Sequence, residues 1–169
     1  MDDEIAHRAL SSHGVTGLQI RSATEADIPL ILQFIRDLAV YEKLEHKVVA
    51  TEEKLRQTLF GSPRPAEVIF AEVDGQAAGF ALFFHNYSTF LAQPGIYLED
   101  LFVKPEMRGR GIGKRLLTHL AHLAKERGCG RVEWAVLDWN KPSIDFYKSI
   151  GAVPLSDWIV FRLDPEKLA

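Results

Sequence analysis

The sequence predicts an α/β domain, in which one mixed β-sheet is covered by helices. Short apolar or alternating runs typical of strands are interleaved with runs of helical period, in the order β-α-α-β-β-β-α-β-α-β-β. The chain has 169 residues, 47% of them hydrophobic and 25% charged, which suits a single globular domain with a real core. The predicted elements are strand 18–23, helices 28–44 and 51–61, strands 67–73, 77–85 and 96–103, helix 112–127, strand 131–137, helix 140–151, and strands 153–155 and 158–163.

Caps and turn residues set the limits of these elements. Thr24 and Asp27 resemble a capping box before the first helix, and Thr51 caps the second. Gly128 follows the third helix in the C′ position, where a left-handed conformation is common. The Asp-Gly pair at 74–75 lies between two apolar runs and is among the strongest signals for a hairpin.

Two stretches carry no clear signal for a strand or a helix. Residues 1–17 have no clear hydrophobic period and are interpreted as an N-terminal extension to a domain of residues 18–169. Residues 86–94 are polar and rich in turn formers, so they are expected to form the connection into strand 96–103.

A glycine-rich turn, RGRGIGK, joins strand 96–103 to the following helix. Glycine lets backbone N–H groups approach a ligand closely, and the free N–H groups and dipole of a helix N-terminus favour an anion such as a pyrophosphate. A Walker-type P-loop is excluded because no Gly-Lys-Ser/Thr follows, and the match to a dinucleotide fingerprint is poor. A tight turn without a ligand is the alternative interpretation. The candidate phosphate-binding residues are Arg108, Gly109, Arg110, Gly111, Ile112, Gly113 and Lys114.

Four segments, LAVYEKLE, IYLEDLFV, RGRGIGK and AVLDWNKPSIDFYKSIGA, occur in the order found in the GCN5-related N-acetyltransferases. The chain resembles the diamine acetyltransferase branch of that family, and the run Tyr87-Ser88-Thr89-Phe90 makes it similar to the thialysine Nε-acetyltransferase subgroup. The resemblance implies a mostly antiparallel mixed sheet with helices on both faces, and acetyl-CoA as co-substrate. It also implies a small cationic amine, such as a thialysine-like amino acid or a diamine, as acceptor, and a homodimer.

Glu99 is the candidate residue for the amine. It lies near the end of its strand beside the glycine-rich turn, where a carboxylate can hold an ammonium group and take its proton directly or through water. Asp100 is expected on the opposite face of the strand if the pleat is regular, unless a bulge intervenes. A salt bridge at the strand edge is the alternative role for Glu99.

The resemblance supplies further site residues. It implies that Tyr147 protonates the leaving thiolate, although a core aromatic residue is the alternative, and that Tyr41 and Glu42 bind the amine, although a solvated helix end would look the same. The strand backbone before the glycine-rich turn would meet the pantetheine amides of the cofactor, and the start of helix 140–151 resembles the segment that contacts the pantetheine arm. The residues concerned are Leu101, Phe102, Val103, Asn140, Lys141, Pro142 and Ser143, with Tyr147 beside the thiol.

Composition argues against other classes of function. A net charge of -3 gives no electrostatic footprint for nucleic acid, and no apolar run approaches the roughly 20 residues that cross a bilayer. The first ten residues lack the features of a signal peptide, so a cytoplasmic location is expected. Cys129 is the sole cysteine, and His119 and His122 lack companions that would complete a metal site, so neither a cysteine nucleophile nor a metal is expected. A protein lysine or N-terminal acetyltransferase and a non-catalytic acyl-CoA-binding module remain as alternatives.

Overall fold

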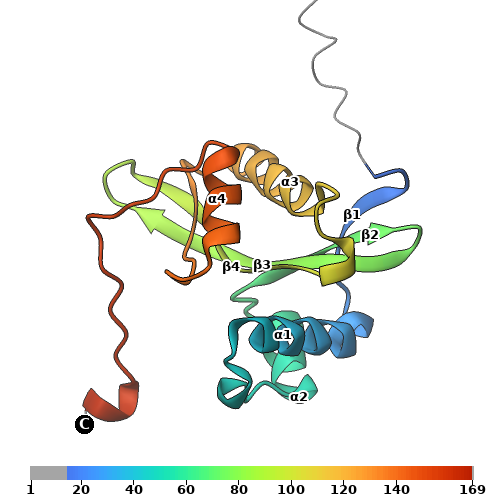
Figure 1. The fold of residues 1–169 in the computed structure, drawn as a ribbon. Helices are drawn as coiled ribbons and strands as arrows, with labels where there is room; N and C mark the ends of the chain where they lie inside the picture. The colour runs from blue at the N-terminus through green and yellow to red at the C-terminus, as the bar shows by residue number, and fades with distance from the viewer. Residues whose placement is uncertain (1–14, 169) are drawn as a thin grey trace, which may run out of the picture. The chain divides into compact units, whose positions relative to one another are not determined.

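The computed structural model describes residues 15–168, and the chain divides between Ala135 and Val136 into two compact units. The first unit holds the sheet, and the second holds one longer helix and the C-terminal segment (Figure 1). The strands are β1 (Leu18–Ser22), β2 (Glu67–Val73), β3 (Gln76–Ser88), β4 (Gln93–Val103) and β5 (Val132–Trp134). The α-helices are α1 (Ile28–Glu42), α2 (Glu52–Leu55), α3 (Ile112–Glu126) and α4 (Lys141–Ser149), and shorter helical turns are η2 (Glu25–Asp27), η3 (Glu45–Lys47), η4 (Arg56–Phe60), η5 (Pro105–Met107) and η6 (Pro165–Leu168). The predicted extension of residues 1–17 lies almost wholly outside the described residues, and its boundary stays a prediction.

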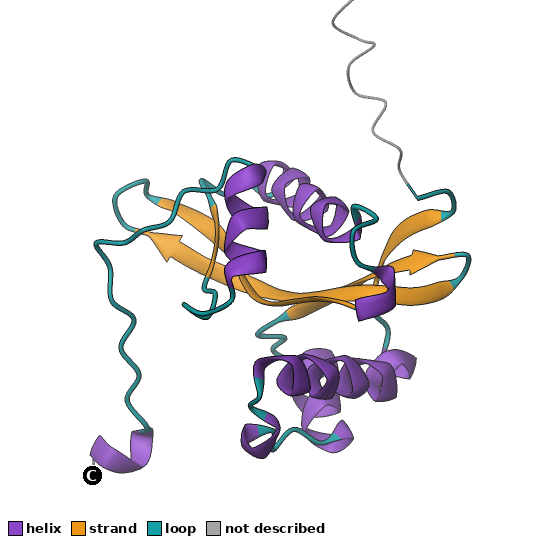
Figure 2. Cartoon of the chain, viewed as in Figure 1, coloured by secondary structure: helices purple, strands orange, loops and turns teal. Residues whose placement is uncertain are grey.

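The five strands form one sheet in the order β1-β2-β3-β4-β5. Neighbours from β1 to β4 are antiparallel, whereas β5 runs parallel to β4. Helices α1 and α2 lie on one face of this sheet, and α3 lies on the other (Figure 2). The predicted class, a mixed and mostly antiparallel sheet with helices on both faces, is therefore confirmed.

Aromatic rings join α1 to the sheet. Phe34 of α1 is 1% exposed, and its ring centroid lies 5.1 Å from that of Phe80 on β3 and 6.1 Å from that of Phe102 on β4. Ile28, Ile31 and Leu38 share this core at helical spacing. The packing fixes α1 against β4, the strand that carries Glu99.

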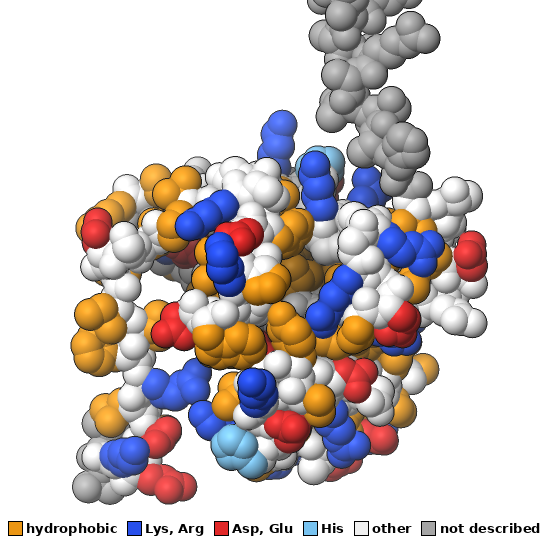
Figure 3. All heavy atoms as spheres, viewed as in Figure 1, with side chains coloured by type: hydrophobic (Ala, Val, Ile, Leu, Met, Phe, Trp, Pro, Cys, Tyr) orange, Lys and Arg blue, Asp and Glu red, His pale blue; other side chains and the backbone are white. Residues whose placement is uncertain are grey.

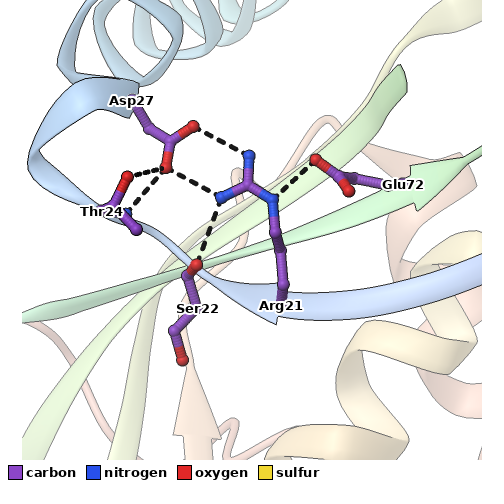
Figure 4. A network of polar contacts seen from close by, with 5 residues as sticks. All are labelled: Arg21, Ser22, Thr24, Asp27 and Glu72. Atoms are coloured by element: carbon purple, nitrogen blue, oxygen red, sulfur yellow. Dashed lines mark hydrogen bonds and ion pairs between the residues drawn. The ribbon is translucent and has the colours of Figure 1, made fainter. Parts of the chain in front are cut away.

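The start of α1 is anchored by a network around Arg21 of β1 (Figure 4). The two terminal nitrogens of the Arg21 guanidinium each donate to Asp27 at 2.8 Å, and Nε donates to Glu72 of β2 at 2.7 Å. Asp27 also accepts hydrogen bonds from the backbone N–H and the hydroxyl of Thr24, so the predicted capping box is confirmed, in η2 directly before α1. The Arg21 bonds are the main reason that the pKa of Asp27 lies well below its usual range.

The two hairpins differ in how well the sequence predicted them. In the β2–β3 turn, Asp74 and Gly75 both have positive φ, 52° and 77°, as a two-residue hairpin turn of this kind requires. The predicted connection 86–94 is wrong, because residues 86–88 of β3 pair with residues 93–95 of β4 and leave only a short turn between them. Polar residues join a strand when a neighbouring strand supplies backbone partners, and local composition does not show that partner.

The C-terminal part also departs from prediction. Helix α4 lies within the predicted 140–151, but the strands predicted at 153–155 and 158–163 are loop, and β5 is shorter than the predicted 131–137 (Figure 2). β-branched and aromatic residues favour a strand only where a second strand pairs with them. Orange apolar side chains follow this segment in Figure 3, and they are 59–89% exposed: Val153, Leu155, Trp158, Ile159, Val160, Phe161 and Leu163.

Candidate active site

A β-bulge in β4 puts one extra residue, Glu99, into the strand. In the register with β3, Leu82 lies opposite Asp100, but the next residue, Phe83, lies opposite Leu98. Glu99 therefore has no residue of its own opposite it. A bulge breaks the strict alternation of side chains, so Glu99 and Asp100 need not point to opposite faces of the sheet. The sequence analysis placed Asp100 on the opposite face from Glu99 unless a bulge intervened, and the structure has that bulge.

At this bulge, the carboxyl groups of Glu99 and of Glu42 from α1 act on the carboxyl group of Asp100. Burial, together with the negative charges of Glu99 and Glu42, raises the pKa of Asp100 to about 6. Burial likewise raises the pKa of Glu42, which is the last residue of α1. A cationic ligand bound here would reduce the repulsion that the charges of Glu99 and Glu42 exert on the Asp100 carboxylate. Asp100 was not predicted as a site residue, because the bulge leaves no signal in the alternating pattern of the strand.

Tyr41 and Glu42 occupy the last turn of α1. The helix ends at Lys43, which has a left-handed conformation with φ 60°, so the two neighbours lie where the helix stops. The guanidinium carbon of Arg108 lies 4.5 Å from the centroid of the Tyr41 ring and 5.4 Å from that of Phe102. The structure therefore brings Tyr41, Glu42 and Arg108 to the end of β4 that carries Glu99.

The glycine-rich turn has the backbone expected of a phosphate-binding loop. Gly109 and Gly111 have φ of 72° and 79°, and open space lies where a Cβ atom would stand on either residue. Gly111 directly precedes the 15-residue helix α3, whose first N–H groups point out of the helix end, as in any α-helix. Gly113 lies inside the first turn of α3. Nη1 of Arg110 lies 3.2 Å from the Met107 sulfur.

β4 and β5 stay paired only over a short distance. In the described part of the sheet, β5 pairs with Ile96–Leu98 and with no later residue of β4. Residues 101–103 pair with β3 along one edge, so their other edge has no strand beside it. Of the carbonyl groups here, that of Val103 accepts a hydrogen bond from Arg108 Nε at 2.9 Å. An extended ligand with amide groups can add to such an edge as a further strand would.

The remaining predicted residues lie in the second unit, at α4. The side chain of Asn140 accepts from the backbone N–H of Ser143 and caps the helix, with Pro142 in its first turn and an ion pair between Lys141 and Asp145. The ring of Tyr147, near the other end of α4, lies 5.4 Å from that of Phe146. Asn140 to Ser143 and Tyr147 thus belong to the second unit, whereas Glu42, Glu99 and Asp100 belong to the first.

The described residues limit two other kinds of site. No group of three or more metal-binding side chains gathers within residues 15–168, and there His119 and His122 lie on α3 without such companions. Nor is any helix of that part of the chain long and apolar enough to cross a membrane.

Comparison with known proteins adds the family. The profile of the acetyltransferase (GNAT) family matches residues 32–152, most of the chain. The chain belongs to the GNAT acetyltransferase family. This GNAT chain is 41% identical over 162 residues to thialysine N-epsilon-acetyltransferase of Bos taurus, covering 89% of this chain and 95% of that protein. It is 36% identical over 196 residues to L-ornithine N5-acetyltransferase NATA1 of Arabidopsis thaliana, covering 89% and 86%.

Solved structures share the fold of this chain. An integron cassette protein from the mobile metagenome of V. cholerae matches the GNAT chain with a TM-score of 0.75 and 28% identity, over 90% of this chain and 96% of that one. An aminoglycoside acetyltransferase from a soil metagenome matches with a TM-score of 0.74 over 88% and 96% of the two chains, but at 22% identity that likeness concerns the fold alone. The predicted family is confirmed, and this GNAT chain is an acyltransferase enzyme.

Proposed function

We propose that this enzyme transfers an acetyl group from acetyl-CoA to a primary amine of a small cationic molecule, a thialysine-like amino acid or a diamine. The observation that carries the proposal is the group of three carboxyl side chains, Glu42, Glu99 and Asp100, beside the glycine-rich turn. The names of relatives 36–41% identical to this chain, which refer to thialysine and ornithine, support the same class of acceptor.

The cofactor is proposed to lie along the end of β4. Its pyrophosphate would bind the N–H groups at Gly109 to Gly113, where the left-handed glycines and the start of α3 favour an anion. Its pantetheine amides would pair with the edge of residues 101–103 that has no strand beside it. From the family resemblance alone, Asn140 to Ser143 of the second unit would contact the pantetheine arm. The protein thus offers the two features that acetyl-CoA needs, an anion site and a strand edge for its amides, at segments close together in the chain.

The carboxyl groups prepare the amine. An alkyl amine has a pKa of roughly 10 and is protonated at neutral pH, so it must lose a proton before it can attack. Glu99 and Glu42 hold the ammonium group by charge, and Asp100, with a pKa of about 6, is ionised at pH 7 and accepts the proton directly or through water. The sequence assigned this step to Glu99 alone, and the bulge adds Asp100 as a second candidate.

The transfer then takes place in one ternary complex. The amine nitrogen forms a bond to the thioester carbonyl carbon, the carbon–sulfur bond breaks, and the electron pair leaves with the sulfur. Tyr147 donates its phenolic proton to that thiolate, so the products are the N-acetyl amine and the free thiol of CoA. Tyr147 is taken from the family resemblance.

An amine panel tests the proposal. Purified enzyme is given acetyl-CoA with thialysine, ornithine, diamines, neutral amines and lysine-containing peptides, and the release of free thiol is followed. The highest kcat/KM is expected for the small dications and amino acids with a side-chain amine. Thiol release with peptides alone would favour a protein acetyltransferase, and binding of acetyl-CoA without release on any amine would indicate a binding module.

We also propose that the enzyme is a cytoplasmic homodimer. The family resemblance implies the dimer, and the exposed apolar segment from Val153 to Leu163 supports it, because a monomer in water rarely exposes so many large apolar side chains together.

A further inference from the structure

Arg108 links three segments of the first unit: the glycine-rich turn, to which it belongs, the end of β4 and the end of α1. Its backbone opens the glycine-rich turn, its Nε donates to the carbonyl oxygen of Val103 at 2.9 Å, and its guanidinium lies 4.5 Å from the ring centroid of Tyr41. The Phe102 ring, 4% exposed and part of the core with α1, lies 5.4 Å away on the same guanidinium. The side chain thus reaches from the turn to the end of α1.

Arginine is suited to this position in a way that lysine is not. A guanidinium presents a flat face to an aromatic ring and still donates from Nε in its own plane, whereas an ammonium group is a compact point charge. One group therefore binds the end of β4 and the Tyr41 ring at the same time. A charged side chain already engaged with two rings and a carbonyl oxygen is poorly placed to serve as a free phosphate ligand.

We propose that Arg108 is a positioning residue, which fixes Tyr41 in the last turn of α1 and so couples the glycine-rich turn to the amine site. The proposal rests on the proposed function, which places Tyr41 and Glu42 at the amine. Glu42 follows Tyr41 directly, and its charge acts on Asp100. A shift of the last turn of α1 therefore changes the electrostatic potential at Asp100. Under this proposal Arg108 does not bind phosphate, and the other residues of the glycine-rich turn keep that role.

Arg108→Lys keeps the charge and removes the flat face and Nε. We expect the KM for the amine to rise about two- to fivefold, the factor that one exposed cation–π contact provides, while acetyl-CoA affinity measured by calorimetry stays unchanged. Tyr41→Leu should also raise the KM for the amine. The double variant should raise this KM no more than the more impaired single variant does, because both changes remove the same contact. Arg36→Lys, on the exposed side of α1, is the matched control and should change neither quantity.

Hydrogen exchange provides a readout that needs no substrate. The amides of Lys43 and Leu44 close the end of α1 on the carbonyls of Val40 and Ala39, at 3.1 and 2.8 Å. They should exchange faster in Arg108→Lys than in wild type or Arg36→Lys, because the turn has lost its tether.

The outcomes separate this inference from the proposed function. A loss of acetyl-CoA affinity with an unchanged amine KM would make Arg108 a phosphate ligand and overturn the inference, as would additive effects in the double variant or unchanged exchange at Lys43 and Leu44. If the wild-type enzyme acetylates no amine, the proposed function fails, and faster exchange in Arg108→Lys still supports the coupling of the turn to α1.

Discussion

Tyr147 is the residue at which catalysis and packing are most easily separated. Tyr147→Phe keeps the ring beside Phe146 and removes only the proposed proton donor. General acid catalysis typically contributes about 10²–10⁴-fold, so kcat should fall on that scale with both substrates saturating. The melting temperature should change little, since the ring remains. A near-normal kcat on the chemical step would contradict the role of Tyr147 as the acid.

Asp100 should set the acidic limb of the pH–rate profile. If its carboxylate accepts the amine proton, kcat/KM for the amine rises as the pH passes through about 6, and Asp100→Asn removes this limb. Glu99→Gln supplies the contrast: loss of its charge should raise the amine KM and lower the pKa of Asp100, shifting the limb to lower pH. A limb that persists unchanged in Asp100→Asn would assign the proton transfer to another group.

The same raised pKa affects stability. Asp100 titrates at 3.8 in its ordinary state and at about 6 in the fold, so its contribution to stability is fully present below pH 3.8 and is lost as the pH rises through 6. Between pH 4 and pH 8 the free energy of unfolding of Asp100→Asn should therefore improve relative to wild type by up to about 3 kcal/mol. Denaturant titrations at the two pH values measure this difference, and a constant difference would contradict it.

Among the structural elements, the glycine-rich turn gives a test with an internal control. In Gly111→Val, a branched side chain must adopt φ of 79° where only open space and the proposed phosphate lie. The strain should cost about 1–2 kcal/mol of stability, and the fold should survive. Acetyl-CoA affinity, measured by calorimetric titration, should fall further than that strain explains.

Gly128→Val is the matched control. Gly128 also has positive φ, 67°, with open space around its missing Cβ, but it follows the far end of α3. A similar loss of stability is expected without a loss of acetyl-CoA affinity. Equal affinities in the two variants would remove the turn from the cofactor site.

The network at the start of α1 should make the fold sensitive to acid. Asp27 has a pKa below its usual range because of Arg21, so its contribution is present above the ordinary carboxyl pKa and is lost as the pH falls through the folded value. Asp27→Asn removes a charge that accepts four hydrogen bonds and should cost about 1–3 kcal/mol at pH 7. Thermal unfolding at pH 7 and pH 3 should show a smaller difference between variant and wild type at pH 3.

Local signals predicted the elements that are determined locally. The Thr24–Asp27 capping box, the Asp-Gly turn at 74–75 and the glycine-rich turn all depend on neighbours in sequence, and all were found where predicted. The bulge at Glu99 and the extension of β3 to Ser88 depend on pairing between distant residues, which an alternating pattern does not encode. Asp100 was missed for that reason, and the contact between Arg108 and Tyr41, which are 67 positions apart, was not predicted either.

At the scale of the whole molecule, the dimer is the main open prediction. Light scattering at assay concentration should give twice the chain mass of 19.0 kDa. If the exposed C-terminal segment contributes to the interface, Phe161→Asp should shift the enzyme toward monomer. Val49→Asp is the control, since Val49 is 73% exposed outside this segment. A monomeric wild-type enzyme would contradict the dimer.

The free edge of β4 at residues 101–103 has a consequence for handling the enzyme. A strand edge without a neighbouring strand is a template on which a second chain can pair, and among the described strands none pairs with this side of residues 101–103. A cofactor that pairs with the edge would also shield it, so substrate occupancy and colloidal behaviour become linked. Stored without CoA, the enzyme should aggregate sooner on warming than the same protein stored with CoA, by more than its gain in thermal stability alone explains.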